Sequence, residues 1–233
     1  MAGRKIQMVR PLAKIGAALL MALSLTVARA QQGATRMDSP QPVENDGKVE
    51  VLEFFAYGCS HCANLEPVFA AWIKKQPATV KIRRIPSPAP LMGIDSTVVY
   101  YSLEALGQND RLHAKIFEAV HVKKEALGNP LMLNKWLDKN GVDPKKYADA
   151  QKSFSVATKV ARARQMLVQY KLRVTPTIIV NGRFSVEPDG SSPEAMFSKI
   201  DRLIADAQLE ITTAPVPSAA RQTPKKTVSL LAK

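Results

Sequence analysis

The sequence predicts an α/β protein in which a block of helices interrupts the segments that form the sheet. Three observations support this fold class. Apolar, β-branched strand patterns occur at 49–57 and again at 177–186. Helical periodicity runs through 95–171, between those two regions. The only two cysteines, Cys59 and Cys62, stand between the first strand and the helix that follows it.

The first thirty residues have the composition of a secretory signal peptide. A basic segment at 4–14 precedes a short apolar run at 15–27, and Ala28-Arg29-Ala30 fits a small-x-small cleavage site. The apolar run is shorter than an ordinary membrane span, so an uncleaved anchor is the weaker alternative. We therefore expect residues 1–30 to be removed, and the mature protein to be soluble in an oxidising compartment.

The charge does not indicate a nucleic-acid partner. The formal net charge of +13 falls to +8 on cleavage, because residues 1–30 carry five basic side chains and no acidic one. The remaining basic residues are spread over helix faces and the tail rather than gathered in one motif, which is typical of solvated surfaces.

The first part of the sheet domain is predicted at 49–94. Residues 31–48 are polar and predict a flexible lead-in. The strand at 49–57 is apolar on both faces, as in a central buried strand. A helix is expected from Cys59, and a second strand at 79–85.

The helical block and the second part of the sheet domain follow. In the block, Asn129-Pro130 and Asp143-Pro144 each place a capping residue before a proline at the first helical position. Asn181-Gly182 predicts a tight hairpin within the second part, 172–211, which ends in a helix. Residues 212–233 lack the apolar content to pack and predict a disordered tail.

The run Cys59-Ser60-His61-Cys62 suits thiol–disulfide exchange. Cys59 is expected at a helix N-terminus, where unpaired N–H groups and the positive end of the helix dipole stabilise a thiolate. His61 is expected to favour that thiolate further. A stabilised thiolate favours the dithiol form and makes the disulfide an oxidant. Cys62, one turn further on, is the expected resolving thiol.

Other interpretations of the two cysteines are weaker. A structural disulfide would close a very small loop and restrain little chain entropy. A zinc site needs about four ligands, and the sequence has no second cysteine pair. We expect neither a metal nor a cofactor, and we expect surface or packed roles for His113 and His121.

A second site is expected at Thr175-Pro176. An X-Pro bond that enters a strand is a candidate cis peptide bond, with the trans form as the alternative. A cis-proline loop beside the cysteines would expose the Thr175 backbone, so that an extended substrate could pair with it as an added strand.

These features together resemble the DsbA family of periplasmic disulfide oxidoreductases, and the element order resembles a thioredoxin fold with an inserted helical domain. The residues that carry the resemblance are Val51-Leu52-Glu53-Phe54-Phe55, Gly58-Cys59-Ser60-His61-Cys62, Val174-Thr175-Pro176 and Val180-Asn181-Gly182-Arg183-Phe184. The likeness covers roughly residues 49–207. This family is itself the standard example of a depressed cysteine pKa and a strong disulfide oxidant, and we take from it only the direction of both effects.

The resemblance implies roles for individual residues. Cys59 matches the nucleophile, Cys62 the resolving thiol and Pro176 the cis-proline. Glu53 matches a buried acid that helps to move protons at the resolving cysteine, with an edge-exposed Glu53 as the alternative. Ser60 departs from the family, which usually has proline there, and this leaves the redox potential open.

The resemblance also implies a function and partners. It implies a monomeric enzyme that introduces disulfide bonds into reduced, unfolded exported proteins in the periplasm and is reoxidised by a quinone-linked inner-membrane protein of the DsbB type. A disulfide isomerase or reductase is one alternative, because Thr175 before the proline also resembles the isomerase branch. That branch carries a dimerisation domain, for which 31–48 is too short. A chaperone-like peptide-binding module is the other alternative.

Overall fold

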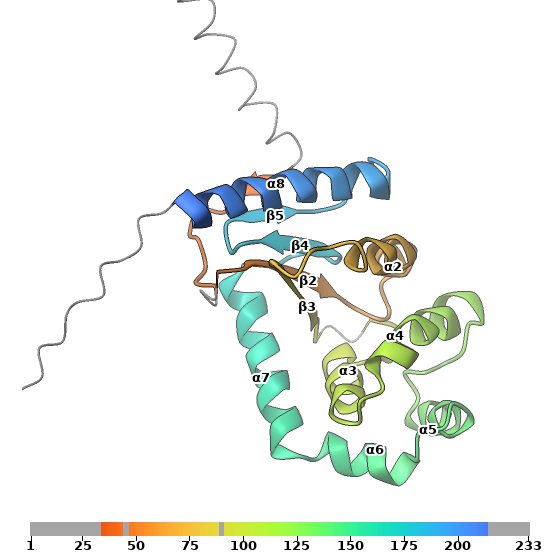
Figure 1. Ribbon diagram of the computed structural model, residues 1–233. Helices are drawn as coiled ribbons and strands as arrows, with labels where there is room; N and C mark the ends of the chain where they lie inside the picture. The colour runs from red at the N-terminus through yellow and green to blue at the C-terminus, as the bar shows by residue number, and fades with distance from the viewer. Residues whose placement is uncertain (1–33, 44–46, 89–90, 214–233) are drawn as a thin grey trace, which may run out of the picture.

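The fold of the chain was analysed in a computed structural model, which describes residues 34–43, 47–88 and 91–213 (Figure 1). The expected signal peptide and most of the expected tail lie outside these residues. The elements, in chain order, are β1 (Thr35–Arg36), β2 (Val49–Phe55), α2 (Ser60–Ile73), β3 (Val80–Pro86), a 3₁₀ turn (Leu91–Gly93), α3 (Ser96–Ala105), α4 (Asn109–Phe117), a π-helical turn (Glu118–Val122), α5 (Pro130–Lys139), α6 (Pro144–Gln151), α7 (Phe154–Gln169), β4 (Thr177–Val180), β5 (Phe184–Val186) and α8 (Pro193–Thr213). Within the described ranges, no helix combines the length and the apolar character that a bilayer crossing needs.

The strands form one five-stranded sheet in the order β1-β5-β4-β2-β3. β2 runs parallel to β3 and antiparallel to β4, and β5 is antiparallel to both of its neighbours. Every residue of β2 is buried, as expected for the central strand that the sequence predicts. The C-terminal end of β2 leads directly into the loop that carries the cysteines.

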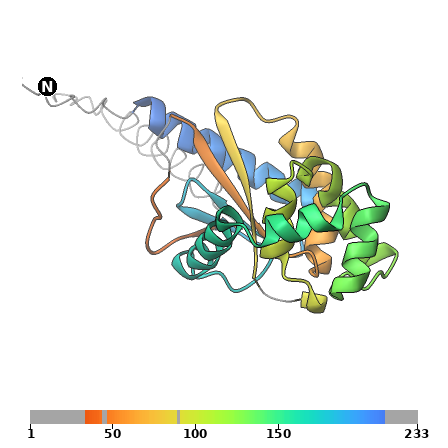
Figure 2. The same ribbon diagram turned by 90° about the horizontal axis from the view of Figure 1, so that it is seen from below.

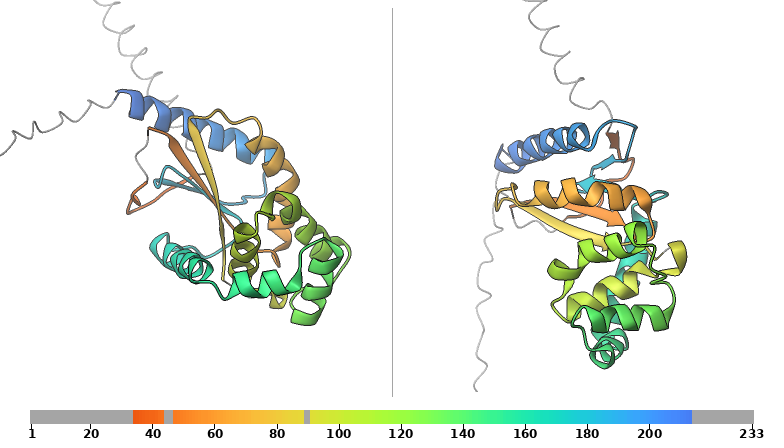
Figure 3. Two further views of the ribbon diagram at one scale, coloured as in Figure 1. Left: turned by 60° about the horizontal axis from the view of Figure 1, so that its bottom comes forward. Right: turned by 90° about the vertical axis from the view of Figure 1, so that its right-hand side faces the viewer.

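Helices cover both faces of the sheet. Residues alternate across β2, so that Val49 and Val51 pack in one core with α2 and α8, while Leu52 and Phe54 pack in a second core with the helical block. Figure 1 and Figure 3 show α8 on one side of the strands and α3 to α7 on the other. Seen from below, in Figure 2, the helical block lies in front and α8 passes behind the strands.

The α2–α8 layer is held by aromatic stacking and by one partly buried polar contact. The rings of Phe69, Trp72 and Phe197 stack at centroid distances of 5.1–5.7 Å. Trp72 Nε1 also donates to Asp201 Oδ1, at 2.8 Å. The helix that carries the cysteines is therefore fixed against α8 along its C-terminal half.

Local signals in the sequence place several element ends correctly. The side chains of Asn129 and Asp143 accept hydrogen bonds from the first turns of α5 and α6, which confirms both predicted caps. Asn181 and Gly182 have φ values of 49° and 63°, as the predicted hairpin between β4 and β5 requires.

Part of the segment 31–48, for which a flexible lead-in was predicted, pairs with the sheet. Within this segment, β1 pairs antiparallel with β5. Backbone hydrogen bonds extend the contact, from Met37 N to Arg183 O (2.9 Å) and from Gln41 N to Gly182 O (2.8 Å). Main-chain pairing, which a polar composition does not exclude, attaches these residues to β5 on the side away from β4.

Candidate active site

The two cysteines lie at the start of α2, directly after the sheet. Cys59 is the N-cap residue of α2, and its backbone N–H donates to Ala56 O, at 3.0 Å. Both cysteines are free thiols in this structure. Cys59 is 9% exposed and Cys62 is 1% exposed. An attacking group from solution therefore meets Cys59 first.

The two thiols have opposite acidities. The pKa of Cys59 is lowered to about 5, and the largest cause is a hydrogen bond from the Cys62 side chain. Burial opposes this shift. Hydrogen bonds from the Thr175 side chain and from the N–H groups of Cys62 and His61 add to it. The hydrogen bond to Cys59 and burial raise the pKa of Cys62 far above its usual value. At neutral pH the reduced site therefore holds a Cys59 thiolate that accepts a hydrogen bond from a Cys62 thiol.

The Thr175–Pro176 segment lies beside Cys59 although the two are far apart in sequence. The Thr175–Pro176 bond is cis. When Cys59 is protonated, its thiol donates to Thr175 O, with an Sγ–O distance of 3.2 Å. Pro176 is buried and Thr175 is partly exposed. A backbone carbonyl thus lies within contact distance of the outer sulfur.

An apolar groove of about 630 Å³ lies beside the active-site loop and is lined in part by His61, between the two cysteines in sequence, and by the Thr175–Pro176 segment. Its lining residues come from α2, from the segment before β4, from the segment between β5 and α8, and from the start of α8: His61, Asn64, Leu65, Val174, Thr175, Pro176, Glu187, Pro188, Gly190, Ser191, Pro193 and Met196. The side chain of His61 is exposed at this groove. The groove is large enough for several residues of an extended chain.

Glu53 is a buried carboxyl group on the central strand. Glu53 is only 1% exposed, which excludes the alternative of a solvent-exposed position at the sheet edge. Burial raises the pKa of Glu53 to about 8, the charge of Arg84 opposes this shift, and Glu66 adds to it. Glu53 therefore holds a proton at neutral pH. The alternation along β2 places Glu53 on the α2 face of the sheet, with Val51.

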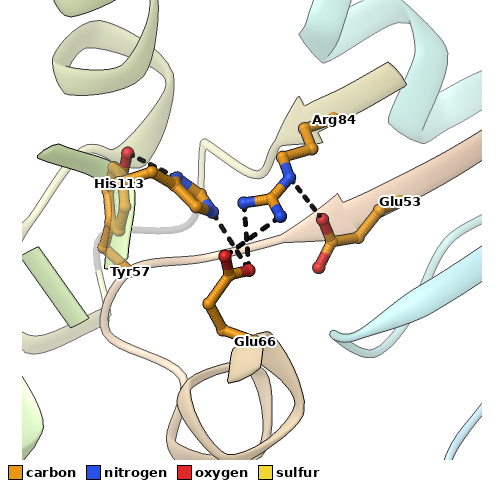
Figure 4. A network of polar contacts seen from close by, with 5 residues as sticks. All are labelled: Glu53, Tyr57, Glu66, Arg84 and His113. Atoms are coloured by element: carbon orange, nitrogen blue, oxygen red, sulfur yellow. Dashed lines mark hydrogen bonds and ion pairs between the residues drawn. The ribbon is translucent and has the colours of Figure 1, made fainter. Parts of the chain in front are cut away.

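A chain of polar contacts leads from Glu53 to the helical block (Figure 4). Arg84, paired with Glu53 in the β2–β3 register, places its Nε 3.4 Å from Glu53 Oε2. Its two terminal nitrogens bind Glu66 on α2, at 2.9 and 3.0 Å. His113 Nε2 lies 3.4 Å from Glu66 Oε2, and His113 Nδ1 lies 3.0 Å from the Tyr57 hydroxyl. The sequence analysis assigned no functional role to Tyr57, Glu66, Arg84 or His113.

The sequence held a partial signal for this chain of contacts. Glu66 follows Cys62 by four residues, so it shares the buried face of α2 with that cysteine. A buried acid on that face requires a partner. His113 has the packed position that was one of its two expected roles, since it is 5% exposed. No group of three or more acidic, cysteine or histidine side chains in the described ranges could hold a metal ion.

Comparisons with known proteins agree with this geometry. A thioredoxin family model matches residues 44–202. A thiol:disulfide interchange protein DsbA from Burkholderia cepacia is 36% identical over 185 residues, which cover 75% of this chain and 87% of that protein. The chain belongs to the DsbA family. It is therefore a thiol–disulfide oxidoreductase that introduces disulfide bonds, built on the thioredoxin fold with an inserted helical domain.

Solved DsbA structures share this fold. The crystal structure of Pseudomonas aeruginosa DsbA matches with a TM-score of 0.71 and 29% identity, over 77% of this chain and 94% of that chain. The oxidoreductase NmDsbA1 from Neisseria meningitidis matches with a TM-score of 0.66 and 29% identity, over 77% of this chain and 94% of that one. The DsbA likeness thus extends over the sheet and the helical block.

The acidity of Glu53 in this DsbA-family chain predicts a pH-dependent effect of Glu53→Gln. A folded-state pKa of about 8, above the ordinary 4.5, means that the unfolded state loses this proton first. The stability contributed by the protonated carboxyl is complete below pH 4.5 and is lost as the pH rises through 8. The glutamine variant lacks this loss. The change in unfolding free energy caused by Glu53→Gln in the oxidised protein should therefore be more favourable at pH 8 than at pH 5, by on the order of a few kcal/mol.

Urea denaturation of the oxidised parent and variant at both pH values measures this difference, without interference from titrating thiols. The same change in unfolding free energy at pH 5 and pH 8 would contradict the assignment of a proton to Glu53.

Proposed function

We propose that the chain oxidises reduced, unfolded proteins by donating a disulfide between Cys59 and Cys62. A substrate thiolate attacks Cys59 Sγ, the Cys59–Cys62 bond breaks, and a mixed disulfide forms. A second substrate thiolate then attacks the substrate sulfur of that bond. The substrate gains a disulfide, and the enzyme retains both electrons as a Cys59 thiolate and a Cys62 thiol.

The opposite pKa shifts of the two cysteines carry this proposal. Lowering the pKa of Cys59 to about 5 stabilises the reduced site and makes Cys59 the better leaving group. The direction of transfer is therefore from the enzyme disulfide to the substrate. Cys62 needs a proton when it leaves, and the protonated Glu53 on the α2 face of β2 is the proposed source.

The remaining predicted site residues are assigned to two roles, thiolate stabilisation for His61 and substrate contact for Thr175 and Pro176. His61 at the groove favours the Cys59 thiolate, with its backbone N–H among the groups that lower the Cys59 pKa. Thr175 and Pro176 border the groove beside the sulfur. An extended, apolar segment of an unfolded protein suits this surface, with its backbone beside Thr175.

The partners and the location follow from the same assignment. We propose that residues 1–30 export the protein to the periplasm as a cleaved signal peptide. There it acts as a monomer on exported proteins. A quinone-linked inner-membrane protein of the DsbB type would reoxidise it: the Cys59 thiolate attacks the partner's disulfide, and Cys62 then resolves the mixed disulfide. The proposal includes no cofactor, metal or nucleic acid.

The resting redox state of the protein tests this function against the alternatives. Acid trapping followed by thiol alkylation should find the periplasmic protein mainly as the disulfide. A mainly dithiol protein would favour the isomerase or reductase. The chaperone-like module would be favoured by two results together. A Cys59→Ala, Cys62→Ala double variant would protect unfolded chains from aggregation as well as the parent does, and the parent would not oxidise reduced proteins.

A further inference from the structure

Tyr57, two residues before Cys59, is held through each of its polar groups by the helical block. Its backbone N–H donates to Ser96 Oγ on α3, at 2.8 Å. Its hydroxyl lies 3.0 Å from His113 Nδ1 on α4, and its carbonyl oxygen lies 2.8 Å from His121 Nε2 in the π-helical turn. The whole residue is buried, with 0% exposure. Two segments of the block, the start of α3 and the continuous stretch formed by α4 and the π-helical turn, therefore fix one residue of the active-site loop.

The chemistry of these groups sets the direction of each hydrogen bond. A carbonyl oxygen only accepts, so His121 Nε2 carries a hydrogen. Burial raises the pKa of Tyr57 well above its usual value and lowers the pKa of His113. The Tyr57 hydroxyl therefore donates to a neutral imidazole, whose remaining N–H at Nε2 points toward Glu66, as in Figure 4.

Aromatic packing leaves the Tyr57 ring little freedom to move. Its centroid lies 5.2 Å from that of Phe55, on the strand, and 5.2 Å from that of Phe117, at the end of α4. The contact with Phe117 is edge-on, as is the contact with Phe55. Phe55 of the strand and Phe117 of the helical block thus enclose the Tyr57 ring from two sides.

These contacts hold both segments that flank Cys59, which are the turn before it and helix α2 after it. The hydrogen bond from Cys59 N to Ala56 O closes a turn that contains Tyr57. On the other side, His113 contacts Glu66, one helical turn beyond Cys62 on α2. A shift of the turn relative to α2 would move Cys59 Sγ away from the N–H groups that stabilise its thiolate.

We propose that Ser96, His113 and His121 are positioning residues for disulfide exchange, which hold Tyr57 so that the helical block sets the reactivity of Cys59. This inference rests on the proposed function, because it concerns the same two cysteines. Each of the three residues acts through Tyr57 and not on a sulfur atom. In a merely structural role, the same contacts would stabilise both redox forms equally and leave the redox equilibrium unchanged.

Two conservative variants and one matched control test the proposal. Ser96→Ala removes the acceptor of the Tyr57 N–H, and Tyr57→Phe removes only the hydroxyl that binds His113. Ser102→Ala is the control, because Ser102 is as buried as Ser96 on the same helix but makes no hydrogen bond to Tyr57. For each protein, equilibrium with glutathione, the thiolate titration of Cys59 and the unfolding of the oxidised form are measured.

Ser96→Ala and Tyr57→Phe should each raise the pKa of Cys59 and weaken the oxidising equilibrium constant by about fivefold, the equivalent of one neutral hydrogen bond. Ser102→Ala should leave both the pKa of Cys59 and the equilibrium constant with glutathione unchanged. Unchanged equilibrium constants in both variants, with folded proteins, would overturn the positioning role. The equilibrium constant of the parent protein with glutathione is a separate result. A parent that is not oxidising would contradict the proposed function. The ratio of the variant's constant to the parent's constant would still test the positioning role.

Discussion

Replacing Cys59 with serine is expected to reduce disulfide transfer to the uncatalysed rate and to prevent mixed disulfides with other proteins. Replacing Cys62 with serine should also end turnover, but the remaining Cys59 thiolate can still attack disulfides of other proteins. The mixed disulfides formed in this way should accumulate, because no Cys62 thiol is present to resolve them. The reason is the difference in exposure, 9% for Cys59 against 1% for Cys62, together with the lowered pKa of Cys59. Oxidation of a reduced test protein measures the first effect, and non-reducing gels measure the second.

A Cys59→Ser, Cys62→Ser double variant is the control for nonspecific association. The trapped species of Cys62→Ser should disappear with reductant and should be absent from the double variant. Mixed disulfides that form in Cys59→Ser, through Cys62, would reverse the assignment of the outer and inner thiols.

The reduced protein is expected to form a single thiolate with a midpoint near pH 5, the value to which its hydrogen bonds lower the pKa of Cys59. The second thiol should not ionise across the neutral range, because burial and its hydrogen bond to Cys59 raise the pKa of Cys62. Thiolate absorbance in the ultraviolet, recorded against pH, measures both. The oxidised protein is the blank for this titration.

The same shift predicts how the stability of the two redox forms varies with pH. A folded-state pKa below the unfolded value of 9.0 contributes stability that is complete above pH 9 and is lost as the pH falls through about 5. The reduced form should therefore gain stability over the oxidised form between pH 5 and pH 9, by up to about tenfold in the unfolding equilibrium constant per pH unit. Parallel stability profiles for the two forms would contradict the lowered pKa.

Features encoded within a few residues could be predicted from the sequence. The caps at Asn129 and Asp143 and the turn at Asn181-Gly182 each depend on one residue pair with a strong local preference. The Cys59–Cys62 spacing likewise places Cys59 at the N-cap of α2 and Cys62 in its first turn. These features agree with the structure because no distant partner is needed to form them.

Features that depend on distant partners could not be predicted in the same way. The pairing of β1 with β5 uses backbone groups, which every residue carries, so the polar composition of 31–48 gave no indication of it. The contacts of His113 with Tyr57 and Glu66 join three elements whose relative placement only the fold supplies. A histidine on a helix of the block therefore had no visible partner in the sequence, although its hydrogen-bond partner Tyr57 stands only two residues before Cys59.

The reduction potential of the Cys59–Cys62 pair against glutathione tests the central claim most directly. The protein is equilibrated in glutathione buffers of varied ratio, and the dithiol fraction is measured after acid quenching. Because the Cys59 thiolate is stabilised at the α2 N-terminus, we expect the cysteine pair to be more oxidising than glutathione. The protein should therefore be mainly in the dithiol form in buffers where oxidised and reduced glutathione are both abundant. A pair that remains a disulfide in excess reduced glutathione would contradict the claim that this site is built to donate its disulfide.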